Sequence, residues 1–183
     1  MIRAIGLVEF NSIAKGIESA DAMLKTGQVE VIASRPICPG KYIALVYGDV
    51  AAVESAVKAG IEKGESYVVD DFILPNVHPQ VIPAFSAGNP VSEVRAVGII
   101  ETFSIAAMIV AADAAVKAGE VDLIEIRLAM GLGGKAFTTM TGDVAAVKSA
   151  VEAGSATAAA KGLLVQEVVI PSPHKGLIPS ILG

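Results

Sequence analysis

The chain contains the same sequence twice. Residues 4–35 align without a gap on residues 96–127, an offset of 96 − 4 = 92, with 15 identities in 32 positions. Further along, GDVAAVESAVKAG from Gly48 returns as GDVAAVKSAVEAG from Gly142, an offset of 142 − 48 = 94. Self-similarity at a fixed spacing is the signature of a repeated structural unit. The chain therefore predicts two related units of about 90 residues each.

The unit boundaries follow from the ends of the repeat. LPNVHP from Leu74 matches IPSPHK from Ile170, and a segment containing Asn89 and Pro90 stands between the copies. Asparagine, proline and glycine together are typical of a connecting loop. We expect a first domain over 1–87, a linker over 88–95 and a second domain over 96–183.

Each copy predicts the same order of elements, strand, helix, strand, strand, helix, strand. Short β-branched runs indicate the strands, and apolar residues three and four apart indicate the helices. In the first copy we expect strands at 4–10, 29–37, 41–47 and 66–74, a helix capped by Asn11 or Ser12 and ended by Gly27, a turn over 36–41, a break at Gly48 and a second helix capped by Asp49. In the second copy we expect strands at 96–103, 121–130, 135–141 and 163–170 and helices at 104–118 and 143–161.

This order predicts an α+β fold, an α/β sandwich. Two tandem βαββαβ units, ferredoxin-like in arrangement, would each form an antiparallel sheet with helices on one face.

Composition excludes several classes of protein. The chain is 53% apolar, yet its longest strong apolar run, residues 105–112, is far shorter than the roughly 20 residues that cross a bilayer. The N-terminus lacks the layout of a secretory signal, so we expect a cytoplasmic protein without a membrane partner. A net charge of −5 without a basic cluster, and 4% aromatic residues, argue against nucleic-acid binding. Surplus apolar surface on small domains predicts an oligomer.

Several strings resemble one known family. AIGLVE and AVGIIE, ESADAMLKTG and VAADAAVKAG, the paired GDVAAV strings and the LPNVHP and IPSPHK endings are similar to the shell proteins of bacterial microcompartments. Two such domains in one chain resemble the tandem-domain class, whose homotrimers imitate the hexamers of single-domain members. The resemblance implies a non-enzymatic, pseudo-hexameric tile of a microcompartment shell in the cytoplasm, which meets other shell proteins edge to edge.

The resemblance also implies where the two central loops lie. In the family, the loop between the second and third strands lines the central opening of the disc. The second copy has the glycine-rich text AMGLGGK there, with Gly131, Leu132, Gly133 and Gly134. The first copy has RPICPGK instead, with Pro36, Ile37, Cys38, Pro39 and Gly40.

Cys38 is the single cysteine of the chain. The flanking prolines restrict the backbone, so the loop holds the thiol at a defined position. Within the class, such a cysteine resembles the iron-sulfur-bearing shell proteins of propanediol-utilising compartments. The resemblance implies one [4Fe-4S] cluster per trimer, bound by Cys38 of each chain, for electron transfer across the shell and possible service to a lumenal redox enzyme.

Other interpretations of Cys38 stay open. A free cysteine is most often a small buried hydrophobe, and a catalytic thiolate lacks an activating neighbour in the local sequence. A tile without a cluster would frame a pore for small polar metabolites. From another class, a tandem α/β ligand-binding module remains possible because one fold hosts many functions.

The remaining matched residues favour structural roles. His78 and His174 occupy equivalent places, and Glu9 and Glu101 are expected to form structural hydrogen bonds rather than an acid and base pair. Lys25 and Lys117 end the first helix of each copy, where a cation complements the helix dipole. The family resemblance further implies that these two lysines lie at the tile edge. No set of residues predicts an enzyme.

Overall fold

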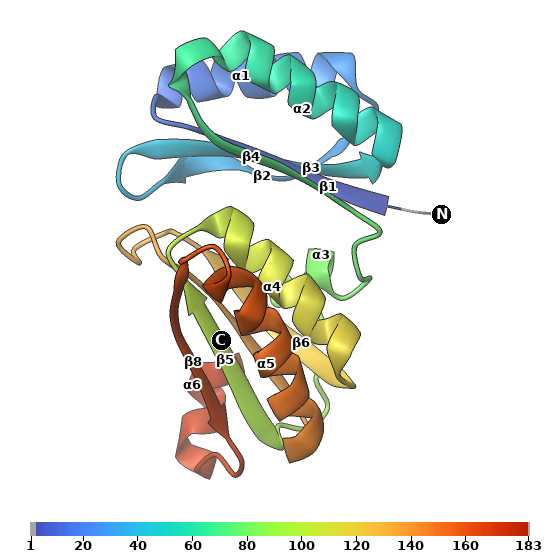
Figure 1. Cartoon of the computed structure of the whole chain (residues 1–183), viewed down its shortest axis with the longest axis vertical. Helices are drawn as coiled ribbons and strands as arrows, with labels where there is room; N and C mark the ends of the chain where they lie inside the picture. Colours follow the sequence, from blue (N-terminus) through green and yellow to red (C-terminus); the bar gives the residue numbers. More distant parts are fainter. Residues whose placement is uncertain (1–2, 183) are drawn as a thin grey trace. The chain divides into compact units, whose positions relative to one another are not determined.

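The computed structural model describes residues 3–182 (Figure 1). Its contacts divide the chain into two compact units, Met1–Val77 and His78–Gly183. This division falls before the 88–95 linker expected from the sequence, because residues 78–87 pack with the second unit. Among the described residues, no helix is both long and apolar enough to span a bilayer.

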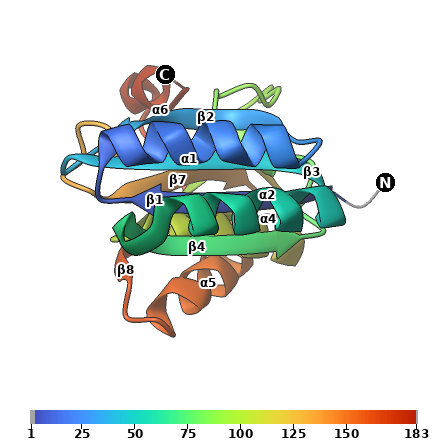
Figure 2. The ribbon, with the colours of Figure 1, turned by 90° about the horizontal axis from the view of Figure 1, so that it is seen from above.

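The first unit contains one sheet and two long helices. Its elements are β1 (Arg3–Phe10), α1 (Ile13–Thr26), β2 (Glu30–Ile37), β3 (Lys41–Asp49), α2 (Val50–Gly64), the 3₁₀ turn η1 (Glu65–Tyr67) and β4 (Val68–Pro75). The strands pair antiparallel in the order β2-β3-β1-β4. The helices α1 and α2 pack side by side over one face of that sheet (Figure 2).

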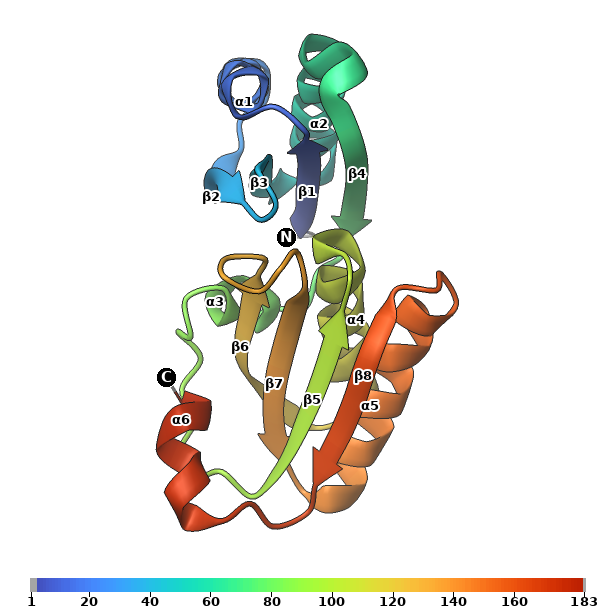
Figure 3. The same cartoon turned by 90° about the vertical axis from the view of Figure 1, so that its left-hand side faces the viewer.

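The second unit repeats this plan with an additional short helix at each end. Its elements are α3 (Val81–Ala84), β5 (Ala96–Thr102), α4 (Ile105–Ala118), β6 (Val121–Leu128), β7 (Ala136–Gly142), α5 (Val144–Ala159), β8 (Leu164–Ile170), η2 (Lys175–Leu177) and α6 (Ile178–Leu182). The strand order is β6-β7-β5-β8, again antiparallel (Figure 3). The predicted α+β fold with two tandem βαββαβ units is therefore confirmed.

Helix starts follow the predicted caps only in part. Ser12 caps α1 by accepting a hydrogen bond from the Lys15 amide at 3.3 Å, and Ser104 caps α4 in the same way. Asp49 and Asp143 occupy the N-cap positions of α2 and α5, but neither side chain makes a capping hydrogen bond. The prediction that the Asp49 side chain caps its helix was wrong, and the matching Asp143 behaves in the same way. The Asp143 carboxylate instead accepts a hydrogen bond from Arg95.

The glycine after the first helix is required for a different reason than expected. Gly27 and Gly119 end α1 and α4 with extended backbones, φ −112° and −141°, rather than the left-handed geometry common at helix ends. A Cβ at Gly27 would lie 2.6 Å from the Ala52 carbonyl oxygen, and a Cβ at Gly119 would lie 2.5 Å from the Ala146 oxygen. Close approach of the second helix of each unit therefore excludes a side chain there.

The hairpin of the first unit is tighter than predicted. Pro36 and Ile37 still pair with β3, so the loop contains only Cys38, Pro39 and Gly40. Gly48 does not break β3, because it pairs with Ala4 of β1.

The two units fill one equivalent core position with different side chains. In the first unit Gly16 of α1 faces Tyr42 of β3, and a Cβ at Gly16 would lie 2.6 Å from the tyrosine ring. In the second unit the matching positions hold Met108 and Ala136, both fully buried. The large residue lies on the strand in the first unit and on the helix in the second, while the order of the strands is the same in both units.

Candidate functional site

The loop between the second and third strands is where the two units differ most. In the first unit it is Cys38, Pro39 and Gly40, between paired residues Ile37 and Lys41. The Cys38–Pro39 peptide bond is cis, Gly40 has φ +71°, and the Cys38 side chain is half-buried. The short span and the proline leave the thiol little conformational freedom.

The corresponding loop of the second unit is longer and richer in glycine. It runs from Ala129 to Lys135, closed by hydrogen bonds from the Ala129 amide to the Lys135 oxygen at 3.1 Å and from the Lys135 amide to the Leu132 oxygen at 3.2 Å. Ala129 has φ +42°, and Gly131, Gly133 and Gly134 have φ +70°, +62° and +87°. These left-handed backbones explain the three glycines. Met130, at the place of Cys38, is 57% exposed.

Both loops are flanked by the same ion pair. Lys41 of β3 donates to Glu9 of β1 at 2.7 Å, and Lys135, the last residue of the second loop, donates to Glu101 of β5 at 2.5 Å. Only 8% of the Glu9 side chain is exposed, compared with 29% for Glu101. The prediction that these glutamates form structural hydrogen bonds is confirmed.

An arginine precedes both loops, but its surroundings differ. The Nε of Arg127 donates to Glu125 at 2.9 Å, and the guanidinium lies 5.9 Å from the centre of the Phe137 ring. The matching Arg35 has a buried Nε without a hydrogen-bond partner in the described structure. Arg35 lacks the two partners of Arg127 because the first unit has Ala33 in place of Glu125 and Ile43 in place of Phe137. The sequence pattern did not predict this contrast, although Ala33 stands opposite Glu125 when the two copies are aligned.

The two histidines make the same turn. The Nδ1 of His78 accepts a hydrogen bond from the Gln80 amide at 3.3 Å, and that of His174 accepts from the Gly176 amide at 3.1 Å. The predicted shared structural role is confirmed.

Both helix-end lysines bond an aspartate one turn earlier. Lys25 donates to Asp21 and Lys117 to Asp113, each at 2.6 Å. Asp113 also accepts a hydrogen bond from the His78 amide at 2.8 Å. Lys25 is the more exposed lysine, with 74% of its side chain accessible against 38% for Lys117. Their role at a tile edge stays a prediction.

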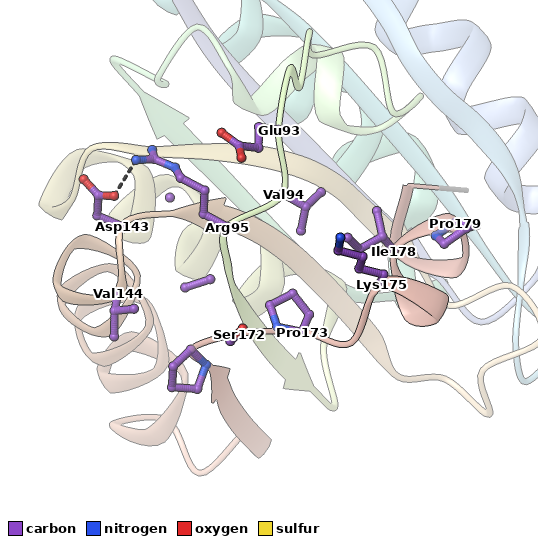
Figure 4. Close-up of a pocket in the computed structure, with 13 residues that line it drawn as sticks. Glu93, Val94, Arg95, Asp143, Val144, Ser172, Pro173, Lys175, Ile178 and Pro179 are labelled. Atoms are coloured by element: carbon purple, nitrogen blue, oxygen red, sulfur yellow. Dashed lines mark hydrogen bonds and ion pairs between the residues drawn. The ribbon is translucent and has the colours of Figure 1, made fainter.

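A surface hollow of about 610 Å³ lies on the second unit (Figure 4). It is bordered by the start of β5, the start of α5, the end of β8 and α6. Figure 4 shows Arg95 turned toward Asp143, with Lys175 and Glu93 also around the hollow. Two cations and two carboxylates give it no net charge.

Within the described part of one chain, Cys38 does not belong to a group of metal-binding side chains. Among residues 3–182, no group of three or more His, Cys, Asp or Glu side chains could hold a metal ion. Cys38 is thus the one sulfur ligand that the first loop offers.

The chain matches one protein family in both units. The BMC domain matches residues 4–77 and 96–173. The bacterial microcompartment shell protein PduT of Citrobacter freundii is 48% identical over 177 residues, covering 97% of this chain and 96% of that protein.

Two further similarities support the tandem organisation. The shell protein EutM of Salmonella typhimurium is 46% identical over 84 residues, which are 45% of this chain but 84% of EutM. The crystal structure of a microcompartment protein from Desulfitobacterium hafniense is 60% identical, with a TM-score of 0.95 over 98% of this chain and 99% of that one. One half of this chain thus corresponds to most of EutM.

Proposed function

The chain belongs to the BMC domain family of bacterial microcompartment shell proteins, with two domains in tandem, and from this premise we propose that three copies close into a pseudo-hexameric ring. Shell proteins of this family assemble with one another into the shell. The ring would be one structural tile of such a shell, in contact with other shell proteins at its edges.

An exposed apolar row on α1 supports assembly. Ile13, Ile17 and Leu24 are 41%, 54% and 42% exposed in the single chain. The matching residues of α4, Ile105, Ile109 and Val116, are at most 6% exposed. Neighbouring exposed apolar side chains on a helix favour burial at an interface, so we infer that a second copy covers this row of α1.

We propose that the ring holds an iron-sulfur cluster at its centre. The single observation behind this is the position of Cys38, the chain's only thiol, in the tight loop that replaces the glycine-rich loop of the second unit. Iron-sulfur clusters usually take about four thiolate ligands. Three copies supply three, and three thiolates around a threefold axis match three corners of a [4Fe-4S] cubane.

The residues present fit such a group. Cys38 is half-buried, so its sulfur can both contact a ligand and be shielded from water. The buried and unpartnered Nε of Arg35 lies on the strand that leads into the same loop. When bound, a cluster supplies one-electron redox chemistry. Its role would be electron transfer across the shell, with a lumenal redox enzyme as a candidate partner.

Anaerobic purification tests the cluster. The wild-type protein should be brown, bleach with dithionite and contain about four irons for every three chains. The Cys38→Ser variant should be colourless but should contain the same number of chains per oligomer as wild type. The Met130→Ser variant, the matched change in the other loop, should keep its iron. Iron and sulfide near zero in anaerobically reconstituted wild-type protein would refute the cluster.

Mass measurement tests the ring. Native mass spectrometry should give three times the chain mass of 18.6 kDa. A monomer at micromolar concentration would contradict the proposal, because Cys38 could then not converge with two copies.

A tile without a cluster is the second candidate. The left-handed backbone at Gly131, Gly133 and Gly134, which carries no side chains, favours a loop that frames an opening for small polar metabolites. A trimer that stays free of iron after reconstitution would favour this function.

We further propose that Lys25 and Lys117 lie at the tile edge. Electron microscopy of Lys25→Ala and Lys117→Ala should show trimers that no longer assemble into sheets. Sheets of wild-type extent from both variants would contradict the edge role.

A further inference from the structure

The two units place an arginine at the same point before their central loops. Arg35 pairs with Ile43 on β3, and Arg127 pairs with Phe137 on β7. The strand register therefore gives the two arginines equivalent backbone positions. Any difference between them arises from the side chains around them.

Arg127 has two partners inside its own unit. Glu125 accepts from its Nε at 2.9 Å and neutralises the charge, and the Phe137 ring lies 5.9 Å from the guanidinium. A carboxylate and an aromatic ring are two of the usual partners of arginine.

Arg35 lacks both partners. Ala33 replaces the carboxylate, Ile43 replaces the ring, and the Arg35 Nε is buried without a hydrogen bond among the described residues. A buried donor of a charged group without an acceptor costs about 1 to 3 kcal/mol or more. Such a group calls for a partner from outside the unit.

The charges around the two loops sharpen the contrast. Lys41 is paired with Glu9, Lys135 with Glu101 and Arg127 with Glu125. Of these four cations around the loops in the described structure, Arg35 alone has no carboxylate within ion-pair distance. It also lies next to the one loop that carries a thiol.

We propose that Arg35 is the counter-charge for the thiolate-held group at Cys38, an inference that rests on the proposed cluster. Three residues of extended strand span about 10 Å, so Arg35 lies about one Debye length from Cys38 at about 0.1 M salt. Each thiolate adds a negative charge, and reduction adds another. A nearby cation therefore stabilises the reduced cluster more than the oxidised one and raises its reduction potential.

The test compares Arg35 with its partnered counterpart. Full-length wild type, Arg35→Gln, Arg35→Lys and Arg127→Gln are reconstituted with iron and sulfide under anaerobic conditions and titrated with dithionite, which supplies the electron. The midpoint potential of Arg35→Gln should shift to more negative values than wild type. Arg35→Lys should stay close to wild type because it keeps the charge, and Arg127→Gln should shift less than Arg35→Gln.

A second measurement follows the stability of the bound iron. Arg35→Gln should release iron to a chelator several-fold faster than Arg127→Gln, because the thiolates repel one another more without their cation. Circular dichroism and native mass serve as folding controls, and Arg35→Gln should keep both, since its Nε bonds nothing in the described structure.

The outcomes separate the two proposals. No iron in reconstituted wild type would refute the cluster itself. Iron-loaded wild type with equal potentials and equal iron release in Arg35→Gln and Arg127→Gln would overturn the role of Arg35 and leave the cluster intact.

Discussion

The loop of Cys38 and the loop of Met130 occupy equivalent places and differ in almost every property. The first has three residues and a proline next to the thiol, whereas the second runs from Ala129 to Lys135 with three left-handed glycines. Yet each is anchored by the same lysine–glutamate pair. The two copies have thus kept the strands and the ion pair that position the loop, while the loop sequences have diverged.

The interior shows the same freedom at one core position. Gly16 with Tyr42 in the first unit corresponds to Met108 with Ala136 in the second. Total volume between helix and strand is what the fold conserves, and either element can supply it.

The largest expected effect comes from exchanging these core residues. Tyr42→Ala should lower the free energy of unfolding by about 3 to 5 kcal/mol, because it leaves a cavity beside α1. Adding Gly16→Met should recover a large part of this loss, since the pair then reproduces Met108 and Ala136. Urea denaturation of both variants measures the recovery.

The control for this exchange is Gly16→Met alone. It should cost about 1 to 3 kcal/mol, because its Cβ would meet the Tyr42 ring. If the two single losses simply add in the double variant, the core positions are not coupled and the comparison fails.

The second effect concerns the ion pairs that anchor the loops. Glu9→Gln should cost about 1 to 3 kcal/mol, because the Glu9 carboxylate is almost fully buried against Lys41. Glu101→Gln should cost less, at most about 1 kcal/mol, because Glu101 is partly exposed. Thermal unfolding of both variants gives the ranking, and a greater loss for Glu101→Gln would contradict it.

A smaller effect is expected at the loop glycines. Gly40→Ala and Gly133→Ala should each cost about 1 kcal/mol, the strain of a left-handed backbone, because no neighbouring atom lies within 4 Å of either added Cβ. Chemical denaturation should therefore give similar values for the two loops. A cost several times larger in one loop would point to contacts formed only in the assembled ring.

The smallest effect is a pH dependence found in the first unit. Hydrogen bonds from Lys63 and then Lys15 hold the pKa of Glu18 below its ordinary value of 4.5. The matching residue of the second unit is Val110. A carboxyl group whose pKa is lowered in the folded state stabilises the protein when the pH is above its ordinary pKa. This stabilisation is lost as the pH falls through the lowered pKa.

Glu18→Gln should therefore melt slightly below wild type at neutral pH and equally with it in acid. Thermal melts across this pH range measure the difference, and Lys148→Gln, a surface change in the second unit, is the control. A difference that persists in acid would assign the effect to something other than the Glu18 charge.

The duplicated sequence predicted much of the fold, and the predictions that were wrong have physical causes. The cap at Ser12, the Glu9 and Glu101 bonds and the shared structural role of His78 and His174 agree with expectation. Asp143 stands at the N-cap position of α5, but its carboxylate accepts a hydrogen bond from Arg95, 48 residues earlier in the chain. Local sequence preference cannot anticipate a competitor supplied by another part of the chain.

The sequence by itself determined the two repeated units, their order of elements, the family and the single thiol, because periodicity, motifs and composition are properties of the chain. Only the tertiary structure decided that the Cys38 loop is three residues long, that Tyr42 takes the space left by Gly16 and that the Arg35 Nε is buried without a hydrogen-bond partner among residues 3–182. These features depend on which side chains meet across strands and helices, and such distances are set by packing rather than by neighbours in sequence.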